Sequence, residues 1–548
     1  MGITQHGPTR QREASAAHRQ ELPTARLQDL LKRSLLYSIR NSSDEKSSRW
    51  QKFADIDLSQ KNRIKFSGTP PCLRFGITDF SGRLALPTED VETLIVGGGL
   101  SGLACAAHLK RNGRTFRLVE QNDHLGGVIR TLSDSGYQIE TGPNSLLARP
   151  EDPLLEYLSF ANLAEKIQTA GRTGKKRFIL KNGQPVALPM SLSEGIFTPV
   201  LSLSGKMRLL KEPFIPPATG TEGLSSDDET IADFVRRRLG EEFLESLIDP
   251  FVKGVYASDP HLLSMADTFP RLVAMEKTYG SLIKGGLALA RQKKGAAPPF
   301  SREILSFSSG MGALPQYLAG LLGEDAGTNA EVIACSRSEN GFRTALLFEE
   351  ETYYIRSRHL VLALPAIQTA PLIAQLAPGA APLLEKIPYA PIAVVYLGYP
   401  RERIAHPLDG FGLLVPSKER RKILGALFSS SLFPGRSPEG HVLLTVFAGG
   451  MVQPKLAQAF DEDLLPIVTG EVKSMLGATG APSYVRIQRW GAAIPQSIPG
   501  HGARIRAIES SLPPGLHLAG AYMGGVSVSQ TFSSGIRAAD TILLTPPS

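Results

Sequence analysis

The sequence predicts an α/β fold, and two segments at opposite ends of the chain indicate it. The apolar run Leu94–Val96 ends in glycines, residues 102–110 have the apolar spacing of a helix, and Phe116–Val119 is the next strand. Near the other end, Leu516–Leu518 has the composition of a strand and also runs into a glycine and then a helix. Strands that alternate with glycine-rich turns and helices are typical of α/β proteins.

The segments between these two ends predict further elements. Residues 231–247 and 313–322 have helical spacing, and several short strands are expected between residues 331 and 364, with a turn near residues 338–341. Residues 191–299 are predicted to be mostly helical, with a Gly/Ser/Asp linker at residues 220–228.

The composition is that of a globular protein. The chain has 548 residues, enough for three or four units of about 150 residues each. An apolar fraction of 42% with 20% charged residues excludes a wholly disordered or collagen-like chain. Three distant cysteines, Cys72, Cys105 and Cys335, predict neither a disulfide framework nor a zinc site, and they indicate a reducing compartment. The longest apolar runs are shorter than the roughly 20 residues that a bilayer-spanning helix needs.

The first 90 residues differ from the rest of the chain. They hold 15 of the 60 basic residues and 10 of the 52 acidic ones, and so contribute +5 of the net charge of +8. We expect a flexible extension or a start placed upstream of the true domain. A mitochondrial or plastid transit peptide is the alternative, which Glu13, Glu21 and Asp29 disfavour because such peptides are poor in acids. Residues 27–39 could form a basic amphipathic helix.

The glycines after the first strand predict a dinucleotide site. In a GxGxxG turn the first glycine permits the tight turn, the second lets the backbone approach a pyrophosphate, and the third allows close packing of helix on strand. The helix N-terminus offers free N–H groups to the phosphates. An acid that ends the second strand suits the ribose hydroxyls and argues against a cofactor with a 2′-phosphate. The predicted residues are Gly97, Gly98, Gly99, Leu100, Ser101 and Gly102, with Glu120 and Gln121.

Later glycine-rich segments resemble those of the flavin amine-oxidase superfamily. Residues 125–131 and 140–145 resemble its loops that line FAD, and residues 516–528 resemble its C-terminal flavin segment, whose helix dipole faces the flavin. The resemblance implies that FAD is the cofactor. The further residues it assigns to FAD are Gly126, Gly127, Gly142, Pro143, Asn144, Ser145, Val332, Trp490, Val526, Ser527 and Val528.

Three internal segments narrow the resemblance to the protoporphyrinogen IX oxidases. They are residues 247–265, residues 490–501, and residues 410–416 with 428–430. The resemblance covers about residues 91–544, and the first 90 residues have no counterpart in it. It implies an FAD-binding Rossmann-like fold of the amine-oxidase and p-hydroxybenzoate-hydroxylase type, with an inserted α+β substrate domain and a helical domain that could contact a membrane.

The expected domain limits follow from this resemblance. Residues 1–90 form the extension. The FAD-binding domain is discontinuous, and the substrate-binding domain is inserted between its parts. The FAD-binding parts are residues 91–145, 300–370 and 485–548; the substrate-binding parts are residues 146–190 and 371–484; the helical domain is residues 191–299.

The implied activity is the oxygen-dependent oxidation of protoporphyrinogen IX to protoporphyrin IX in haem and chlorophyll synthesis. FAD accepts hydride at N5 in three two-electron steps, and O₂ reoxidises it to give H₂O₂. Because the flavin supplies the redox chemistry, we assign no acid–base residue and no metal. Product transfer to a chelatase and a homodimer are compatible with this activity.

The resemblance also implies substrate contacts. Arg177 matches an arginine that pairs with a propionate, and a guanidinium suits a carboxylate bidentately. Leu414, Leu427 and Phe447 match positions that sandwich pyrrole rings, and Gly412 matches a backbone position at the cavity. There are two departures from the pattern. Ala521 stands where many FAD folds place an Asp for the ribityl chain, and Asn144 stands where some relatives have a basic residue.

Several alternatives remain open. A coproporphyrinogen III oxidase of the same fold would need more basic residues around its substrate, because that substrate has four carboxylates. A flavin amine oxidase lacks support in residues 522–526, which supply no aromatic cage, and residues 494–496 disfavour a carotenoid desaturase. A flavoprotein kept as a binding module would not turn over substrate. No nucleic-acid recognition motif is present.

Membrane contact is a separate prediction. Leu201, Met207, Leu209 and Leu210 lie beside Lys206, Arg208 and Lys211, which is compatible with a surface patch that binds a bilayer from one side. The alternative is a packed helical subdomain with solvated lysines. The expected location is the cytoplasm or the cytoplasmic membrane of a bacterium, with a mitochondrion or plastid as the alternative.

Overall fold

The computed structural model describes residues 88–147, 152–159, 166–170, 173–189, 198–217, 229–292 and 304–546. All of them belong to one compact unit, Asp79–Ser548. The predictions for residues 1–87, for the linker at 220–228 and for Cys72 lie outside the described residues.

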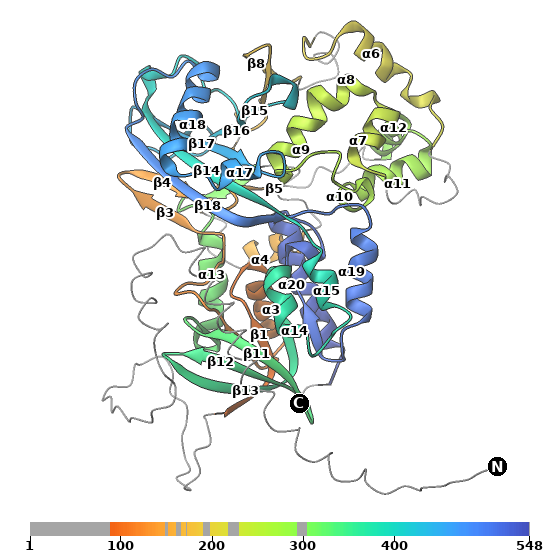
Figure 1. The fold of residues 1–548 in the computed structure, drawn as a ribbon, viewed down its shortest axis with the longest axis vertical. Coiled ribbons are helices and arrows are strands. Elements are labelled where there is room, and N and C mark those ends of the chain that lie inside the picture. The colour runs from red at the N-terminus through yellow and green to blue at the C-terminus, as the bar shows by residue number, and fades with distance from the viewer. Residues whose placement is uncertain are drawn as a thin grey trace, which may run out of the picture. The chain divides into compact units, whose positions relative to one another are not determined.

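The first sheet is mainly parallel and contains strands from both of the segments that predicted the α/β fold, near residues 94–119 and near residues 516–518 (Figure 1). Its order is β10-β2-β1-β13-β12-β11, and β19 pairs with the other side of β13. The pairs β1–β2, β1–β13, β2–β10 and β13–β19 are parallel, whereas β11, β12 and β13 form an antiparallel edge. The strands are β1 (Thr88–Val96), β2 (Phe116–Val119), β10 (Ala326–Gly327), β11 (Glu331–Ser338), β12 (Gly341–Phe348), β13 (Glu351–Leu362) and β19 (Leu516–Leu518).

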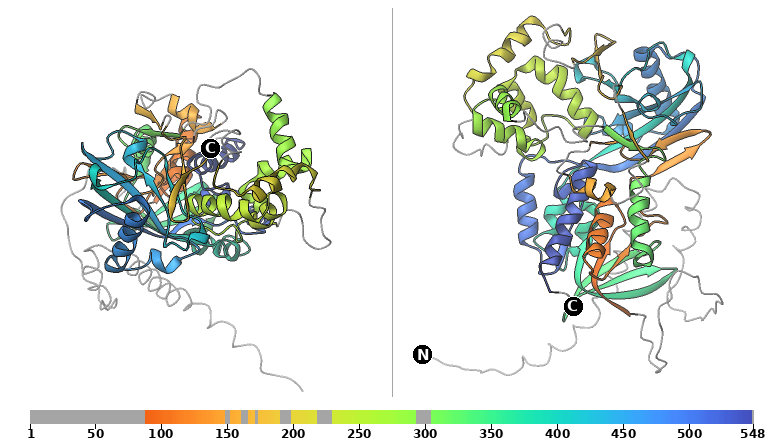
Figure 2. Two further views of the ribbon diagram at one scale, coloured as in Figure 1. Left: turned by 90° about the horizontal axis from the view of Figure 1, so that it is seen from above. Right: turned by 180° about the vertical axis from the view of Figure 1, so that it is seen from behind.

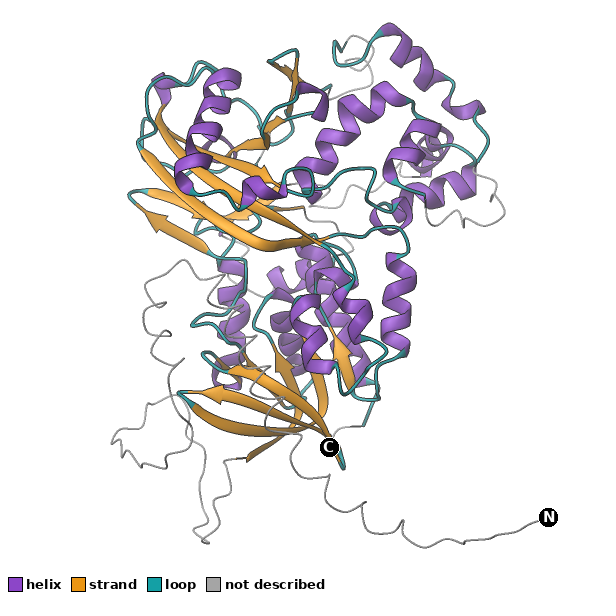
Figure 3. Cartoon of the chain, viewed as in Figure 1, coloured by secondary structure: helices purple, strands orange, loops and turns teal. Residues whose placement is uncertain are grey.

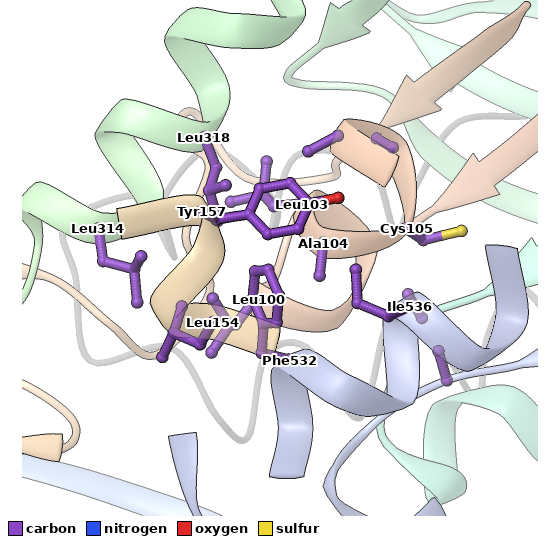
Figure 4. Close-up of a cluster of buried hydrophobic side chains, with 14 of the residues drawn as sticks. Leu100, Leu103, Ala104, Cys105, Leu154, Tyr157, Leu314, Leu318, Phe532 and Ile536 are labelled. Atoms are coloured by element: carbon purple, nitrogen blue, oxygen red, sulfur yellow. The ribbon is translucent and has the colours of Figure 1, made fainter. Parts of the chain in front are cut away.

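Helices cover both faces of this sheet, because side chains alternate along β1. Ile95 faces α3 (Leu100–Arg111), α13 (Ala313–Leu322) and α20 (Val528–Leu543). Leu94 and Val96 face α14 (Ala366–Ile373), α15 (Ala381–Glu385) and α19 (His501–Ser510). Figure 4 shows the first cluster, where side chains of α3, α4 (Pro153–Ser159), α13 and α20 meet. The predicted α/β fold is therefore confirmed.

The second sheet has the order β18-β14-β17-β16-β15-β7-β8 and is mostly antiparallel (Figure 3). One face packs on α18 (Asp461–Leu476), which contributes Leu464, Val468 and Val472 to a buried core. Its strands are β7 (Phe178–Lys181), β8 (Gln184–Ala187), β14 (Tyr389–Pro400), β15 (Gly412–Leu414), β16 (Ile423–Phe428), β17 (His441–Gly449) and β18 (Tyr484–Pro495). Because β18 pairs with β14, residues 485–495, which were assigned to the FAD-binding domain from the sequence, lie in this second sheet.

The described part of residues 191–299 is helical, as expected (Figure 2). Residues 231–247, expected to be helical, are helical in separate segments and not as one continuous helix. The helix ends at Arg238 because Gly240 adopts φ 97°, and a π-helical turn, Leu244–Ile248, then leads into α9. The helices are α6 (Leu203–Leu210), α7 (Ile231–Arg238), α8 (Glu241–Phe243), α9 (Asp249–Tyr256), α10 (Met265–Thr268), α11 (Pro270–Tyr279) and α12 (Leu282–Gln292). Among the described residues, no helix has both the length and the apolar character to cross a bilayer.

Smaller elements connect these parts. The hairpin of β3 and β4 and a three-stranded sheet of order β5-β9-β6 complete the strands of the described ranges. The elements are β3 (Thr131–Asp134), β4 (Tyr137–Glu140), β5 (Leu146–Leu147), β6 (Ile167–Thr169), β9 (Ile304–Phe307), α16 (Ser429–Leu432) and α17 (Pro454–Ala457).

Candidate functional site

The glycine turn between β1 and α3 combines tight packing on one side with open space on the other. Gly97 adopts φ 105°, and a Cβ atom on Gly102 would lie 1.9 Å from the carbonyl oxygen of Gly97. A Cβ on Gly99, in contrast, would meet no protein atom within 4 Å. The N-terminus of α3 has no side-chain cap and no acid in its first turn. The backbone here is therefore open to an anionic ligand.

Glu120 directly follows β2 and lies at this turn. Its carboxylate is buried and accepts hydrogen bonds from the main-chain N–H of Gly98 (2.7 Å) and of Asn122 (2.9 Å). These bonds fix its orientation, and carboxylate oxygens have further lone pairs for a ligand hydroxyl. Gln121 is exposed beside it. The main-chain N–H of Ala330 donates to the Glu120 carbonyl, which brings the start of β11, with the half-buried Val332, to the same edge.

The second glycine segment lies against the first. The main-chain N–H of Gly126 donates to the Gly98 carbonyl at 2.8 Å, and Gly126 forms a bridge with Gly99. A Cβ on Gly127 would lie 3.1 Å from Cα of Gly99. The two motifs are thus adjacent in space.

The loop Thr141–Ser145 follows β4 and is held from two sides. The hydroxyl of Thr141 donates to the carbonyls of Val128 and Arg130, and a Cβ on Gly142 would lie 2.4 Å from the Val128 carbonyl oxygen. Trp490 of β18 donates from Nε1 to the Thr141 carbonyl at 2.8 Å. Pro143, Asn144 and Ser145 are half-buried.

The C-terminal segment packs onto the first helix. A Cβ on Gly535 of α20 would lie 2.0 Å from the Ser101 carbonyl oxygen, so α20 and α3 touch backbone to backbone. Ser527 caps α20 and forms a capping box with Gln530, and Val526 precedes it. Ala521, which stands in place of the expected Asp, is half-buried in a 3₁₀ turn, Ala521–Met523. Cys105 on α3 is fully buried, and burial raises the pKa of its thiol, so it acts as a packing residue.

These observations fit a dinucleotide with an adenosine ribose and a pyrophosphate. The helix N-terminus, the space beside Gly99 and the buried Glu120 supply the three contacts that such a ligand needs. The fold and this site define a nucleotide-binding α/β protein of the flavoprotein type.

The predicted substrate residues share one face of the second sheet. Gly412 pairs with Leu427, while Leu414 pairs with Gly425, which in turn pairs with Phe447. Leu414, Leu427 and Phe447 are half-buried, although their neighbours on the opposite face are fully buried. A Cβ on Gly412 would lie 2.3 Å from the Ala426 carbonyl oxygen, so the position excludes other residues.

Arg177 lies at the start of β7, directly before its first residue. Its guanidinium is 5.4 Å from the ring centre of Phe411, and it has no carboxylate partner among the described residues. The adjacent Lys176 forms an ion pair with Asp409 at 2.5 Å. Of these two neighbouring cations, Arg177 is the one available to a ligand carboxylate.

Sequence reasoning missed one residue of this region. Gly254 lies in α9, and a Cβ on it would be 2.4 Å from Cδ2 of Leu414. Asp249, also in α9, accepts bonds from the main-chain N–H and the hydroxyl of Ser417, which fix the helix to the hairpin of β15 and β16. A glycine inside a helix was the signal in the sequence, because such a glycine costs stability unless close packing requires it.

Comparison with known proteins identifies the family. The family model described as flavin containing amine oxidoreductase matches residues 100–543. The chain is 34% identical over 481 residues to protoporphyrinogen oxidase 2, chloroplastic/mitochondrial, of Arabidopsis thaliana, covering 82% of this chain and 93% of that one. It is 27% identical over 478 residues to coproporphyrinogen III oxidase of Bacillus subtilis, covering 82% and 98%.

A solved structure agrees with this match. The crystal structure of an Exiguobacterium protein, provisionally assigned as a protoporphyrinogen oxidase, aligns with a TM-score of 0.69 at 25% identity and covers 84% of this chain and all of that one. The chain belongs to the flavin containing amine oxidoreductases, in the group that includes the protoporphyrinogen oxidases. It is an FAD-dependent oxidoreductase, and the predicted family and cofactor are confirmed.

Proposed function

We propose that this chain catalyses the oxygen-dependent oxidation of protoporphyrinogen IX to protoporphyrin IX. The observation that carries the proposal is the half-buried apolar face of Leu414, Leu427 and Phe447, with Arg177 at its edge. An apolar tetrapyrrole with propionates at one side matches a surface of this kind.

The chemistry divides between the cofactor and the chain. FAD, when bound, accepts two electrons and a hydrogen in each of three steps and returns the electrons to O₂, which gives H₂O₂. Leu414, Leu427 and Phe447 pack against the pyrrole rings and exclude water, and Arg177 binds a propionate and orients the ring. Trp490 fixes the loop Thr141–Ser145 through its hydrogen bond to Thr141. The proton that the substrate loses with each hydride passes to solvent, and the reduction of O₂ to H₂O₂ takes one proton back, so no net proton is released.

Coproporphyrinogen III is the second candidate substrate, since a relative named for that activity covers the chain. It carries four carboxylates. Lys176 is paired with Asp409, and Lys253 and Lys418 donate to Ser417 and Ser246, so their side chains are engaged. Because these three lysines are engaged and Arg177 has no carboxylate partner among the described residues, the arrangement favours a substrate with fewer carboxylates, protoporphyrinogen IX.

An aerobic fluorescence assay with both porphyrinogens in parallel tests the proposal. We expect porphyrin to form faster from protoporphyrinogen IX, with H₂O₂ released in step. A flavin-loaded enzyme that forms porphyrin from neither substrate would overturn it, and faster oxidation of coproporphyrinogen III would assign the alternative.

Membrane contact forms a second part of the proposal. Leu203, Met207, Leu210 and Phe214 are exposed, and their spacing places them on one side of α6 and the turn after it. The sequence had placed Leu201 and Leu209 in this patch, but Leu201 is buried and Leu209 half-buried, and Arg208 is bonded to the carbonyls of Arg237 and Arg238.

Vesicle binding tests this part. Wild-type protein should sediment with anionic vesicles, and Leu210→Glu with Phe214→Glu should abolish sedimentation while oxidation of dissolved substrate continues. If the wild-type protein does not sediment with these vesicles, the proposed membrane contact is wrong. A homodimer, product transfer to a chelatase, and a bacterial, mitochondrial or plastid location stay predictions.

A further inference from the structure

The end of β4 and the loop Thr141–Ser145 that follows it, which is expected to line the flavin, are tied to the second sheet by three side chains. The hydroxyl of Tyr396 in β14 donates to the Glu140 carbonyl at 2.5 Å, and Trp490 in β18 donates to the Thr141 carbonyl at 2.8 Å. The third is Arg436, in the connection between α16 and β17, whose Nη1 lies 3.0 Å from Oε1 of Glu140.

Arg436 occupies a dense hydrogen-bond network. Besides Glu140, it donates from Nη1 to Oε1 of Gln138, and from Nη2 to the hydroxyl of Ser306 (2.8 Å) and the carbonyl of Phe307 (3.2 Å). Its exposed fraction is 2%, although arginine is seldom buried. A single guanidinium therefore joins the second sheet to β4 and β9.

Glu140 is equally constrained from the flavin-binding side. Its Oε1 accepts from the main-chain N–H of Met311, and its Oε2 accepts from the hydroxyl of Thr131 at 2.6 Å. Thr131 in turn accepts from the main-chain N–H of Gly312 at the start of α13. The carboxylate is thus fixed by the first-sheet side and by Arg436 together.

The pair lies between the two halves of the proposed site. Glu140 and Arg436 line a small pocket with Asn144 of the flavin loop and with Thr445 of β17. Thr445 pairs with Leu427, one of the proposed pyrrole contacts. A buried ion pair costs desolvation and is often less stabilising than apolar residues of the same volume. We therefore expect the Glu140–Arg436 pair to contribute mainly a fixed geometry between the loop and the second sheet, and not stability.

We propose that Arg436 is a positioning residue, which through Glu140 fixes the loop Thr141–Ser145 to the second sheet and so sets the distance between flavin and substrate. The part that concerns the substrate rests on the function proposed above. The part that concerns the flavin loop rests on the family and on these contacts.

The substitution Arg436→Lys tests this role. Lysine keeps the charge but cannot reach four acceptors in a fixed fork. We expect kcat to fall about 10- to 100-fold, because displacement of reacting groups by about 1 Å has effects of this size. KM and the FAD content should change much less. Tyr396→Phe removes the bond to the carbonyl of Glu140, directly before the loop, and should give a smaller loss in kcat.

The matched control is Arg356→Lys. Arg356 also forms a two-pronged pair, with Asp90, but that pair is exposed on the first sheet and remote from the loop. This variant should keep wild-type kcat and the wild-type flavin spectrum.

A spectroscopic readout separates positioning from a merely structural role. In the holoenzyme, Arg436→Lys should change the shape of the visible flavin absorption band and slow anaerobic flavin reduction by substrate, while dithionite reduces the flavin as in the wild type. Wild-type kcat and spectrum in this variant would overturn the proposal, as would a loss of activity that only follows loss of FAD or a lower Tm.

Two further outcomes are informative. If Arg436→Lys does not fold, Tyr396→Phe decides by the same readouts, and an unchanged kcat and spectrum overturn the proposal. If wild-type enzyme oxidises neither porphyrinogen, the proposed function fails, but the flavin spectrum still tests the link between Arg436 and the loop.

Discussion

Gly535 of α20 lies so close to Ser101 of α3 that a Cβ atom on Gly535 would stand 2.0 Å from the Ser101 carbonyl oxygen. The last helix of the chain is thereby seated on the helix that begins at the glycine turn. Both belong to one buried cluster on the first sheet.

Gly535→Ala should therefore destabilise the protein. The added methyl group must push two backbones apart, and overpacking of this kind costs about 1–3 kcal/mol. The control is Gly320→Ala in α13, where a Cβ meets nothing within 4 Å. That change should stabilise the helix by about 0.4–1 kcal/mol. Thermal unfolding of both variants measures the difference, and equal Tm values would contradict the packing argument.

Gly99→Ala should affect the cofactor and not the fold. No protein atom lies within 4 Å of the added methyl group, so the free energy of unfolding without cofactor should be unchanged. The same methyl group would occupy the space expected for the pyrophosphate, and a clash of about 1–3 kcal/mol corresponds to a roughly 5- to 150-fold weaker Kd. Flavin content and FAD titration check this. If Gly99→Ala binds FAD with wild-type affinity, the pyrophosphate does not lie beside Gly99.

Arg177→Ala should raise KM for protoporphyrinogen IX about tenfold or more, because a charge-assisted hydrogen bond is worth about 1.5–3 kcal/mol. FAD content should not change. Lys176→Ala is the matched control, since Lys176 already pairs with Asp409. Its KM should stay near the wild-type value. Loss of FAD from Arg177→Ala, or a larger effect at Lys176, would show that Arg177 is misassigned.

The His359–His517 pair should make the protein sensitive to acid. His517 in β19 lies 3.3 Å from His359 in β13, and burial, with His359 as the second cause, lowers the pKa of His517 to about 4. Burial also lowers the pKa of His359, which faces Glu92, Arg114 and Arg358. In the unfolded chain a histidine takes up its proton near pH 6.5.

Stability should therefore fall as pH decreases from about 6.5 to about 4, because the unfolded state binds more protons. At about 1.4 kcal/mol per pKa unit, His517 contributes a loss of about 3 kcal/mol. His517→Gln should flatten the Tm profile in this interval. An unchanged slope would mean that other groups cause it.

Much of the nucleotide site could be predicted from sequence because its signals are local. β2, α13 and β19 lie at the predicted residues, and the two glycine motifs are adjacent as expected. A glycine that a turn requires, or an acid that ends a strand, is visible within a few residues of its neighbours. The break inside the helical residues 231–247 was not predicted, because the apolar spacing continues past Gly240, whereas the helical backbone is interrupted there.

The sequence by itself determined the fold class, the flavin-type turn and the family. Only the tertiary structure decided how the second sheet meets the loop Thr141–Ser145. Arg436 and Glu140 are almost 300 residues apart in the sequence. Trp490 and Thr141 are likewise distant in the sequence, although Trp490 donates a hydrogen bond to the Thr141 carbonyl. No periodicity or motif encodes such pairs, because they depend on which strands pair and on how two separately packed sheets are placed. The tertiary structure also placed β18 in the second sheet. It showed that Lys176, next to Arg177, is already paired with Asp409.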